Sequence, residues 1–143
     1  MSTEQNKAIV RRVFDEIVNK GRMSAADELL AADYVNHNFP APAPGAEGFK
    51  LVTTMFRTAF PDIVVTLEDE LAEGDKVVTR GRFEGTHKGE FMGIPATGRR
   101  VSIKYLDIWR LENGKCKENW VQMDLLGLMQ QMGVIPAPGQ TTT

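Results

Sequence analysis

The sequence predicts an α+β domain in which helices pack on one face of a curved antiparallel sheet. Two observations carry this prediction. Apolar residues recur at helical spacing up to Pro61, and beyond it they alternate with polar residues as they do in strands. Turn signals at residues 73–75 and 112–114 then separate the strand-like runs. Helices followed by hairpin-connected strands are typical of an α+β architecture.

The first predicted helix begins near Ser2 or Thr3, either of which can cap it, with Gln5 or Asn6 three residues on as the capping-box partner. It ends at Gly21. Residues at helical spacing form its buried stripe: Ile9, Val10, Val13, Phe14, Ile17 and Val18. This amphipathic pattern predicts that one side of the helix packs against the sheet.

Two more helices and a short strand are predicted before Pro61. Ser24 caps a short helix, and residues 33–38 are typical of a short strand or extended segment. The next segment, 39–45, has too many prolines for a helix or an inner strand. Helical spacing returns over 49–59, and Pro61 ends it.

Four strands and a last helix are predicted after Pro61. The strands cover residues 63–71, 76–86, 99–111 and 115–124, and a helix follows over 125–132. A curved sheet covered by helices on its concave side leaves a cavity in which small ligands usually bind.

The length and composition indicate one globular domain. The chain has 143 residues, 42% hydrophobic and 25% charged, so we expect a single domain over 1–135 and a flexible tail over 136–143. The net charge of −2, with no basic run, argues against a nucleic-acid partner.

The cysteine count and the lengths of the apolar runs indicate where the protein is located. Cys116 is the only cysteine, so no internal disulfide can form and a reducing cytoplasm fits best. The N-terminus has no signal-peptide core, and no apolar run reaches the roughly 20 residues of a membrane span. We therefore expect a cytoplasmic protein with no membrane partner.

One acid interrupts the apolar face of the strand predicted over 99–111. Asp107 lies at the same parity as Tyr105 and Trp109, which should face the core. A buried carboxyl costs several kcal/mol, as an order-of-magnitude figure, unless it is protonated or hydrogen-bonded. Asp107 is either a structural acid with fixed partners or a pocket acid with a raised pKa.

The acid at the end of the last strand has two interpretations. Asp124 could point into the pocket and transfer protons, or it could cap the helix that follows it. Trp120 and Gln122 share its parity, while Val121 and Met123 lie on the other face. Apolar residues on both faces predict that both are covered, one by the cavity and the other by a partner subunit.

The two histidines, His37 and His87, lie far apart with no cysteine cluster or acidic ladder, so no metal site is expected. His37 is the group best matched to general base catalysis near neutral pH, although a surface or packing role is the alternative.

Five segments carry a specific resemblance to a known family, and they occur in this order: 33–37, 60–62, 73–78, 85–98 and 114–131. Together they resemble the SnoaL-like polyketide cyclase (ester cyclase) family of the ketosteroid isomerase and nuclear transport factor superfamily. The similarity extends from about residue 5 to 133, and its most specific part is 85–98.

The resemblance implies a cone-shaped α+β barrel and usually a dimer or tetramer, and we expect a homodimer. The best-understood members of the family close a ring of an aromatic polyketide precursor by intramolecular aldol condensation, without a metal or covalent intermediate, so no cofactor is expected. The resemblance also implies roles for three residues. Asp124 matches the family's acid/base aspartate, His37 matches a pocket histidine, and Asp107 lies where ketosteroid isomerases place an acid that helps hold an oxyanion.

Six residues are candidates for substrate binding. Aromatic side chains could form flat apolar walls, with ordinary core packing as the alternative role. The candidates are Trp120, Trp109, Tyr105, Phe91, His87 and Asn119.

The leading hypothesis is a metal-free cyclase or isomerase that acts on a small hydrophobic carbonyl compound. The alternatives are a non-catalytic protein that binds a small ligand in the same cone and, third, an epoxide-hydrolase-like enzyme. The third would need an arginine between the pocket carboxylates. None of the same-face neighbours of these carboxylates is an arginine. They are Tyr105 and Trp109 beside Asp107, and Gln122 beside Asp124.

Overall fold

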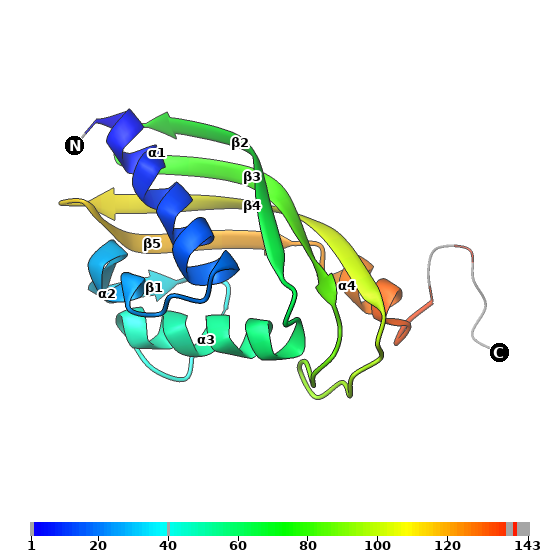
Figure 1. Ribbon diagram of the computed structural model, residues 1–143. Helices are drawn as coiled ribbons and strands as arrows, with labels where there is room; N and C mark the ends of the chain where they lie inside the picture. The colour runs from blue at the N-terminus through cyan, green and yellow to red at the C-terminus, as the bar shows by residue number, and fades with distance from the viewer. Residues whose placement is uncertain (1, 40, 137–138, 140–143) are drawn as a thin grey trace.

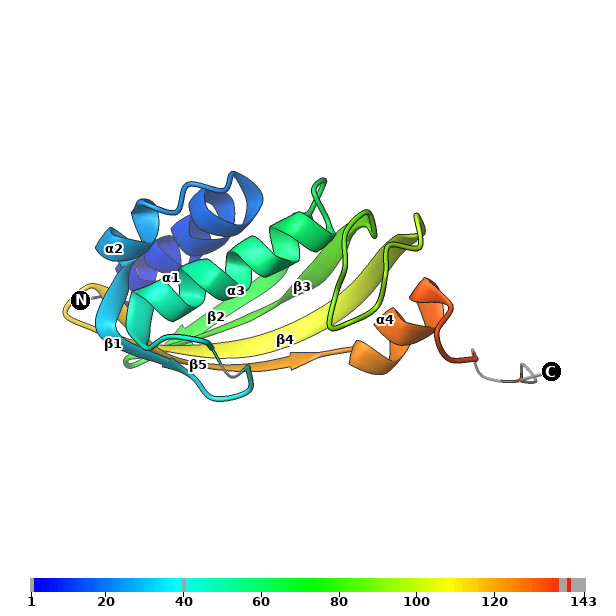
Figure 2. The ribbon, with the colours of Figure 1, turned by 90° about the horizontal axis from the view of Figure 1, so that it is seen from below.

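The computed structural model describes residues 2–39, 41–136 and 139, which contain a curved sheet with helices on its concave face (Figures 1 and 2). Most of the predicted flexible tail, at 137–138 and 140–143, lies outside these residues. Among the described residues, no helix is both long and apolar enough to cross a membrane.

The helical segments lie where the apolar spacing predicts them, with adjusted ends. They are α1 (Thr3–Arg12), η1 (Val13–Asn19), α2 (Ala25–Leu29), α3 (Gly45–Ala59) and α4 (Leu125–Met132). Ser2 and Gln5 form the predicted capping box, in which the Ser2 hydroxyl accepts the Gln5 N–H at 3.1 Å. The helix then widens into the π-helical turns of η1.

Helix α3 begins at Gly45, four residues before the predicted start. The φ angle of Gly45 is +64°, and a Cβ there would lie 1.9 Å from the Ala32 carbonyl oxygen. Glycine is therefore required where this helix starts against the neighbouring strand.

The sheet has the order β1-β5-β4-β3-β2. Its strands are β1 (Leu30–Asn36), β2 (Val64–Glu73), β3 (Lys76–Thr86), β4 (Arg100–Glu112) and β5 (Lys115–Met123). The predicted antiparallel pairing is confirmed for β2 to β5, whereas β1, for which no pairing was predicted, runs parallel to β5 and makes the sheet mixed. Because β1 and β2 remain edges, the cone is open rather than a closed barrel.

The concave face of the sheet carries the core. In β4, buried and exposed residues alternate from Val101 to Trp109, which confirms the predicted parity. Helices α1 and α3 cover this face, while α4 lies at the end of the sheet against the start of β4, where the Gln131 side chain bonds the Ser102 backbone (Figure 2). The odd positions of β3 and β4 therefore form the floor of the space beneath the helices.

A side chain from η1 forms hydrogen bonds with the free edge of strand β2. The Asn19 amide donates to the Val65 carbonyl at 3.0 Å, and its oxygen accepts the Val65 N–H at 2.7 Å. This pair occupies backbone groups that the edge would otherwise expose, and it joins the helical layer to the sheet.

We expect Asn19→Ala to lower the free energy of unfolding by about 1–3 kcal/mol, because both backbone groups of the buried Val65 lose their partner. Urea denaturation would measure the change. Gln122→Ala is the control, since it truncates an exposed amide that makes no hydrogen bond among the described residues. Equal stability of the two variants would contradict a role for Asn19 in closing the edge.

Candidate active site

A cavity of about 120 Å³, here called the inner cavity, lies between the helices and the concave face of the sheet. Most of its walls are apolar, and the phenylalanines come from η1, α3 and β3 as well as from the loop after β1. Four of the nine candidate site residues line it: Tyr105, Asp107, Trp109 and Asn119. The chemistry available in this space is set by the few polar groups among them.

Asp107 is the acid of the inner cavity. It is only 3% exposed, and its two carboxyl oxygens have different partners. The Thr79 hydroxyl bonds one oxygen in a very short contact, and the Trp109 indole N–H donates to the other at 2.9 Å. Thr79 lies directly opposite Asp107 in the β3–β4 pairing, so the strand register places this donor.

Burial raises the pKa of Asp107 from 3.8 to about 7. Hydrogen bonds from Thr79, Trp109 and Asn119 act in the opposite direction because they stabilise the charged form. Near neutral pH the carboxyl therefore exists in both protonation states inside an apolar space. This is the property required of a group that both accepts and donates protons.

The side-chain amides of Asn119 and Asn36 are hydrogen-bonded to each other beside Asp107, and this pair is here called the polar line. Asn119, 2% exposed, donates to the Ile108 carbonyl at 3.0 Å, and its oxygen accepts a long 3.4 Å bond from the Asn36 amide. The oxygen of Asn36 in turn accepts the backbone N–H groups of Asn38 and Phe39 at 2.9 and 3.0 Å. The cavity wall is thus tied to the loop that follows β1.

Asp124 lies outside the inner cavity and is exposed. It is the N-cap of α4, and its Oδ1 accepts the Gly127 N–H at 2.8 Å. A Cβ at Gly127 would come within 2.2 Å of the carboxylate, so a larger residue there would require the end of the Asp124 side chain to shift. The structure gives Asp124 the capping position, and its proton-transfer role remains a prediction from the resemblance.

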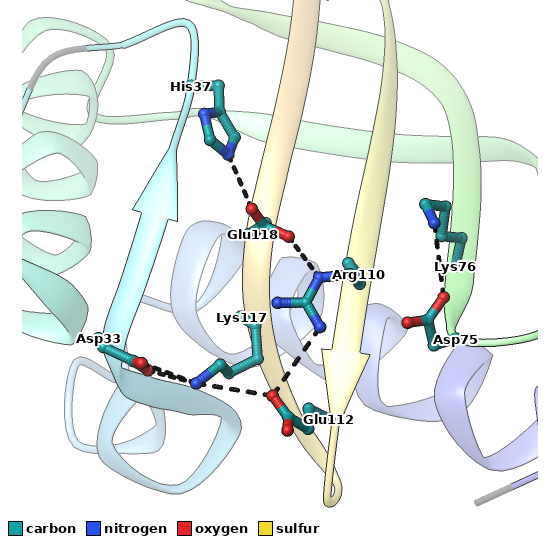
Figure 3. Close-up of polar contacts among 8 residues, drawn as sticks. All are labelled: Asp33, His37, Asp75, Lys76, Arg110, Glu112, Lys117 and Glu118. Carbon is teal, nitrogen blue, oxygen red and sulfur yellow. Dashed lines mark hydrogen bonds and ion pairs between the residues drawn. The ribbon is translucent and has the colours of Figure 1, made fainter.

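His37 and Trp120 lie together on the outer, convex face of the sheet. Their rings stack with centroids 4.8 Å apart, and His37 Nε2 lies 3.2 Å from a Glu118 oxygen. Glu118 also pairs with Arg110, which extends a network of ion pairs across the strands (Figure 3). Neither His37 nor Trp120 lines the inner cavity, so the structure does not bring them to Asp107.

His87 and Phe91 belong to the packed end of the sheet near the 87–98 loop. The backbone N–H of Thr97 donates to His87 Nδ1 at 3.2 Å, and the ring packs on Phe60 at 5.5 Å. Phe91 is fully buried against Phe56 and Phe60. Neither lines the inner cavity.

Sequence reasoning missed two polar residues of the site, Thr79 and Asn36. Thr79 carries a usable signal, because it occupies an inward-facing position of β3 among apolar residues. Asn36 carries none, because its contact depends on the parallel pairing of β1 with β5. Within 2–39, 41–136 and 139, no cluster of three or more His, Cys, Asp or Glu residues could hold a metal ion.

The family model described as SnoaL-like polyketide cyclase matches residues 8–132. Aklanonic acid methyl ester cyclase DnrD of Streptomyces peucetius is 31% identical, with coverage of 93% of this chain and 92% of that protein. Nogalonic acid methyl ester cyclase of Streptomyces nogalater is 28% identical, with coverage of 80% and 88%. The structure of TsrD from Streptomyces laurentii superposes with a TM-score of 0.87 at 32% identity, over 94% of this chain and 99% of that one.

We expect the Asp107 carboxyl to make stability fall as pH rises. Because its folded pKa, about 7, lies above the unfolded value of 3.8, its contribution is fully present below about pH 4 and is lost as pH rises through 7. The total is on the order of a few kcal/mol, since one pKa unit corresponds to about 1.4 kcal/mol. Thermal unfolding from pH 4 to 8 should show this slope in the wild type and lose it in Asp107→Asn.

A second variant, at Thr79, tests the same pH dependence of stability. Thr79→Val removes a donor to the charged carboxyl, so it should move the pH-sensitive window of stability upward. Identical slopes in the wild type and Asp107→Asn would show that Asp107 does not titrate in this range.

Proposed function

The chain belongs to the SnoaL-like polyketide cyclase family, and we propose that it is a cyclase or isomerase using acid/base chemistry on a small hydrophobic carbonyl compound. The observation that carries the proposal is the buried Asp107, whose pKa is about 7 in an otherwise largely apolar cavity. Four predicted site residues meet at this place, whereas His37, His87 and Asp124 do not.

Aldol-type ring closure needs two proton-handling functions that Asp107 can supply in turn. The charged carboxyl can remove a proton next to a carbonyl, and the protonated one can donate to the oxygen that becomes negative. The bonds from Thr79 and Trp109 hold the carboxyl in one orientation. Fixed geometry in an apolar space makes both steps more favourable than in water.

The ligand favoured by the inner cavity is neutral. The described residues that line it include no lysine or arginine, and its one acid is Asp107. A ligand carboxylate would be desolvated there without a counter-ion and would lie near a like charge. The two related cyclases are named for methyl esters, which lack that charge. An uncharged ester or ketone is thus the substrate class we propose.

Of the two alternatives, the residues that line the inner cavity argue only against the epoxide-hydrolase-like enzyme. Epoxide-hydrolase-like chemistry would need an arginine between carboxylates, and no described residue lining the inner cavity is an arginine. A non-catalytic binding role uses the same cavity and ligand class, so turnover separates it from the proposal.

Ring closure of aklanonic acid methyl ester, followed by chromatography, tests the proton carrier. We expect Asp107→Asn to lower kcat by about 100-fold or more, since general acid–base catalysis contributes about 10²–10⁴-fold. Asp124→Asn is the matched control, because asparagine can still accept the Gly127 N–H. It should keep kcat within about tenfold of the wild type.

The opposite pattern, with Asp124→Asn inactive and Asp107→Asn active, would assign proton transfer to Asp124. Equal kcat in all three proteins would exclude both acids. Binding of the ester by the wild type without ring closure would favour the non-catalytic alternative.

We also propose that the outer face of the sheet pairs with a second copy of the chain. Directly opposed positions of β2 to β5 form one apolar row: Leu71, Val78, Ile108 and Trp120. Leu71 is 67% exposed and Ile108 38%. Charges beside the row are already neutralised within the chain, as in the Arg80–Asp69 and Arg110–Glu118 pairs. Covering this face therefore buries apolar surface and leaves few unpaired charges.

We expect the wild type to be a dimer by light scattering and Ile108→Lys to be a monomer, because a charge at the centre of the row would be buried unpaired. Leu126→Lys is the control, since it changes an exposed leucine on α4, away from the row. A monomeric wild type, or an Ile108→Lys dimer, would refute this interface.

A further inference from the structure

A second cavity, the outer cavity, adjoins the inner one and is larger. Its volume is about 580 Å³, against about 120 Å³ for the inner cavity. It lies between β1, the loop residues 39 and 41–44, and the first half of α3. Ligand pockets usually measure about 300–1,000 Å³, a range that the inner cavity misses and the outer cavity meets.

The two cavities share part of their walls. Four residues line both of them: Asn36, Phe39, Phe49 and Val52. Asn36 holds the backbone of Phe39 through its side-chain oxygen and reaches Asn119 in the inner cavity through its amide. The boundary between the cavities is therefore built on the same polar line that borders Asp107.

The outer cavity suits an uncharged apolar group. Prolines and alanines of the 41–44 segment form one side, and Phe49 and Val52 of α3 form another. Its one ionisable carboxyl, Asp33, has both oxygens 2.7 Å from Lys117 Nζ. No lysine or arginine is among the described residues that line it.

Tyr34 connects the wall of the outer cavity to that of the inner cavity. It lines the outer cavity and is 4% exposed. Its ring centroid lies 5.7 Å from that of Phe49, which lines both cavities, and 6.3 Å from that of Trp109, which lines the inner one. The two cavities are therefore bordered by one packed group of aromatic rings.

We propose that the outer cavity is the second half of the ligand site. An elongated neutral ligand places its carbonyl-bearing ring in the inner cavity near Asp107. Its apolar extension lies between β1, the 41–44 segment and α3. The inference rests on the proposed function for the choice of a carbonyl ligand. It adds that most of the ligand is bound outside the cone, by residues that do not take part in the chemistry.

The test compares two ketones by isothermal titration calorimetry. Acetophenone carries the reactive ring alone, and 4-acetylbiphenyl adds an apolar extension. We expect the wild type to bind 4-acetylbiphenyl about tenfold more tightly or better, since burying another ring removes further apolar surface from water. Ala41→Phe fills the outer cavity from an exposed loop position that does not line the inner one.

Ala41→Phe should remove this advantage and leave the Kd of acetophenone within about twofold. Ala96→Phe is the matched control, because it makes the same change at an exposed loop residue that lines neither cavity, and it should leave both affinities unchanged. Equal loss for both ketones, or no loss for either, would overturn the two-part site.

Asp107→Asn separates this inference from the proposed function. If Ala41→Phe has no effect while Asp107→Asn weakens both ketones, the outer site is wrong and the proposed function stands. If Ala41→Phe weakens only 4-acetylbiphenyl while Asp107→Asn changes neither Kd, the outer site stands and Asp107 is not the carbonyl partner. If neither ketone binds the wild type, the outer site and the proposed function are both wrong.

Discussion

The burial of one carboxyl constrains much of this structure. Asp107 can remain in an apolar interior only with hydrogen-bond donors at fixed positions, and these are Thr79 on the neighbouring strand and Trp109 on its own. A slip of one residue in β4 would turn Asp107 and Trp109 to the convex face and expose apolar surface. The register of the sheet, the floor of the inner cavity and the raised pKa are therefore consequences of one arrangement.

Much of the fold could be predicted because it follows from local patterns. Period-two alternation located the long strands and placed Asp107 inside, and the capping box fixed the start of α1. The orientation of β1 could not be predicted, because a short strand carries no information about which distant strand it joins. The start of α3 was missed because Gly45 is dictated by contact with the Ala32 carbonyl rather than by apolar spacing.

The site was predicted only in part for the same physical reason. Parity along one strand found Tyr105, Asp107 and Trp109, which need no knowledge of the neighbouring strands. The pairing of Asn36 with Asn119 depends on the β1–β5 register, and the stacking of His37 on Trp120 depends on which face of β5 is convex. Contacts made between elements distant in sequence decide these placements, and no local pattern contains them.

The cap of α4 links the side chains at positions 124 and 127. A Cβ at residue 127 would lie 2.2 Å from the Asp124 carboxylate, so a larger residue there requires the end of this flexible side chain to shift. Such a shift moves the carboxylate away from the N–H of residue 127 and weakens the cap. The effect of a substitution at 127 on stability therefore depends on which residue stands at 124.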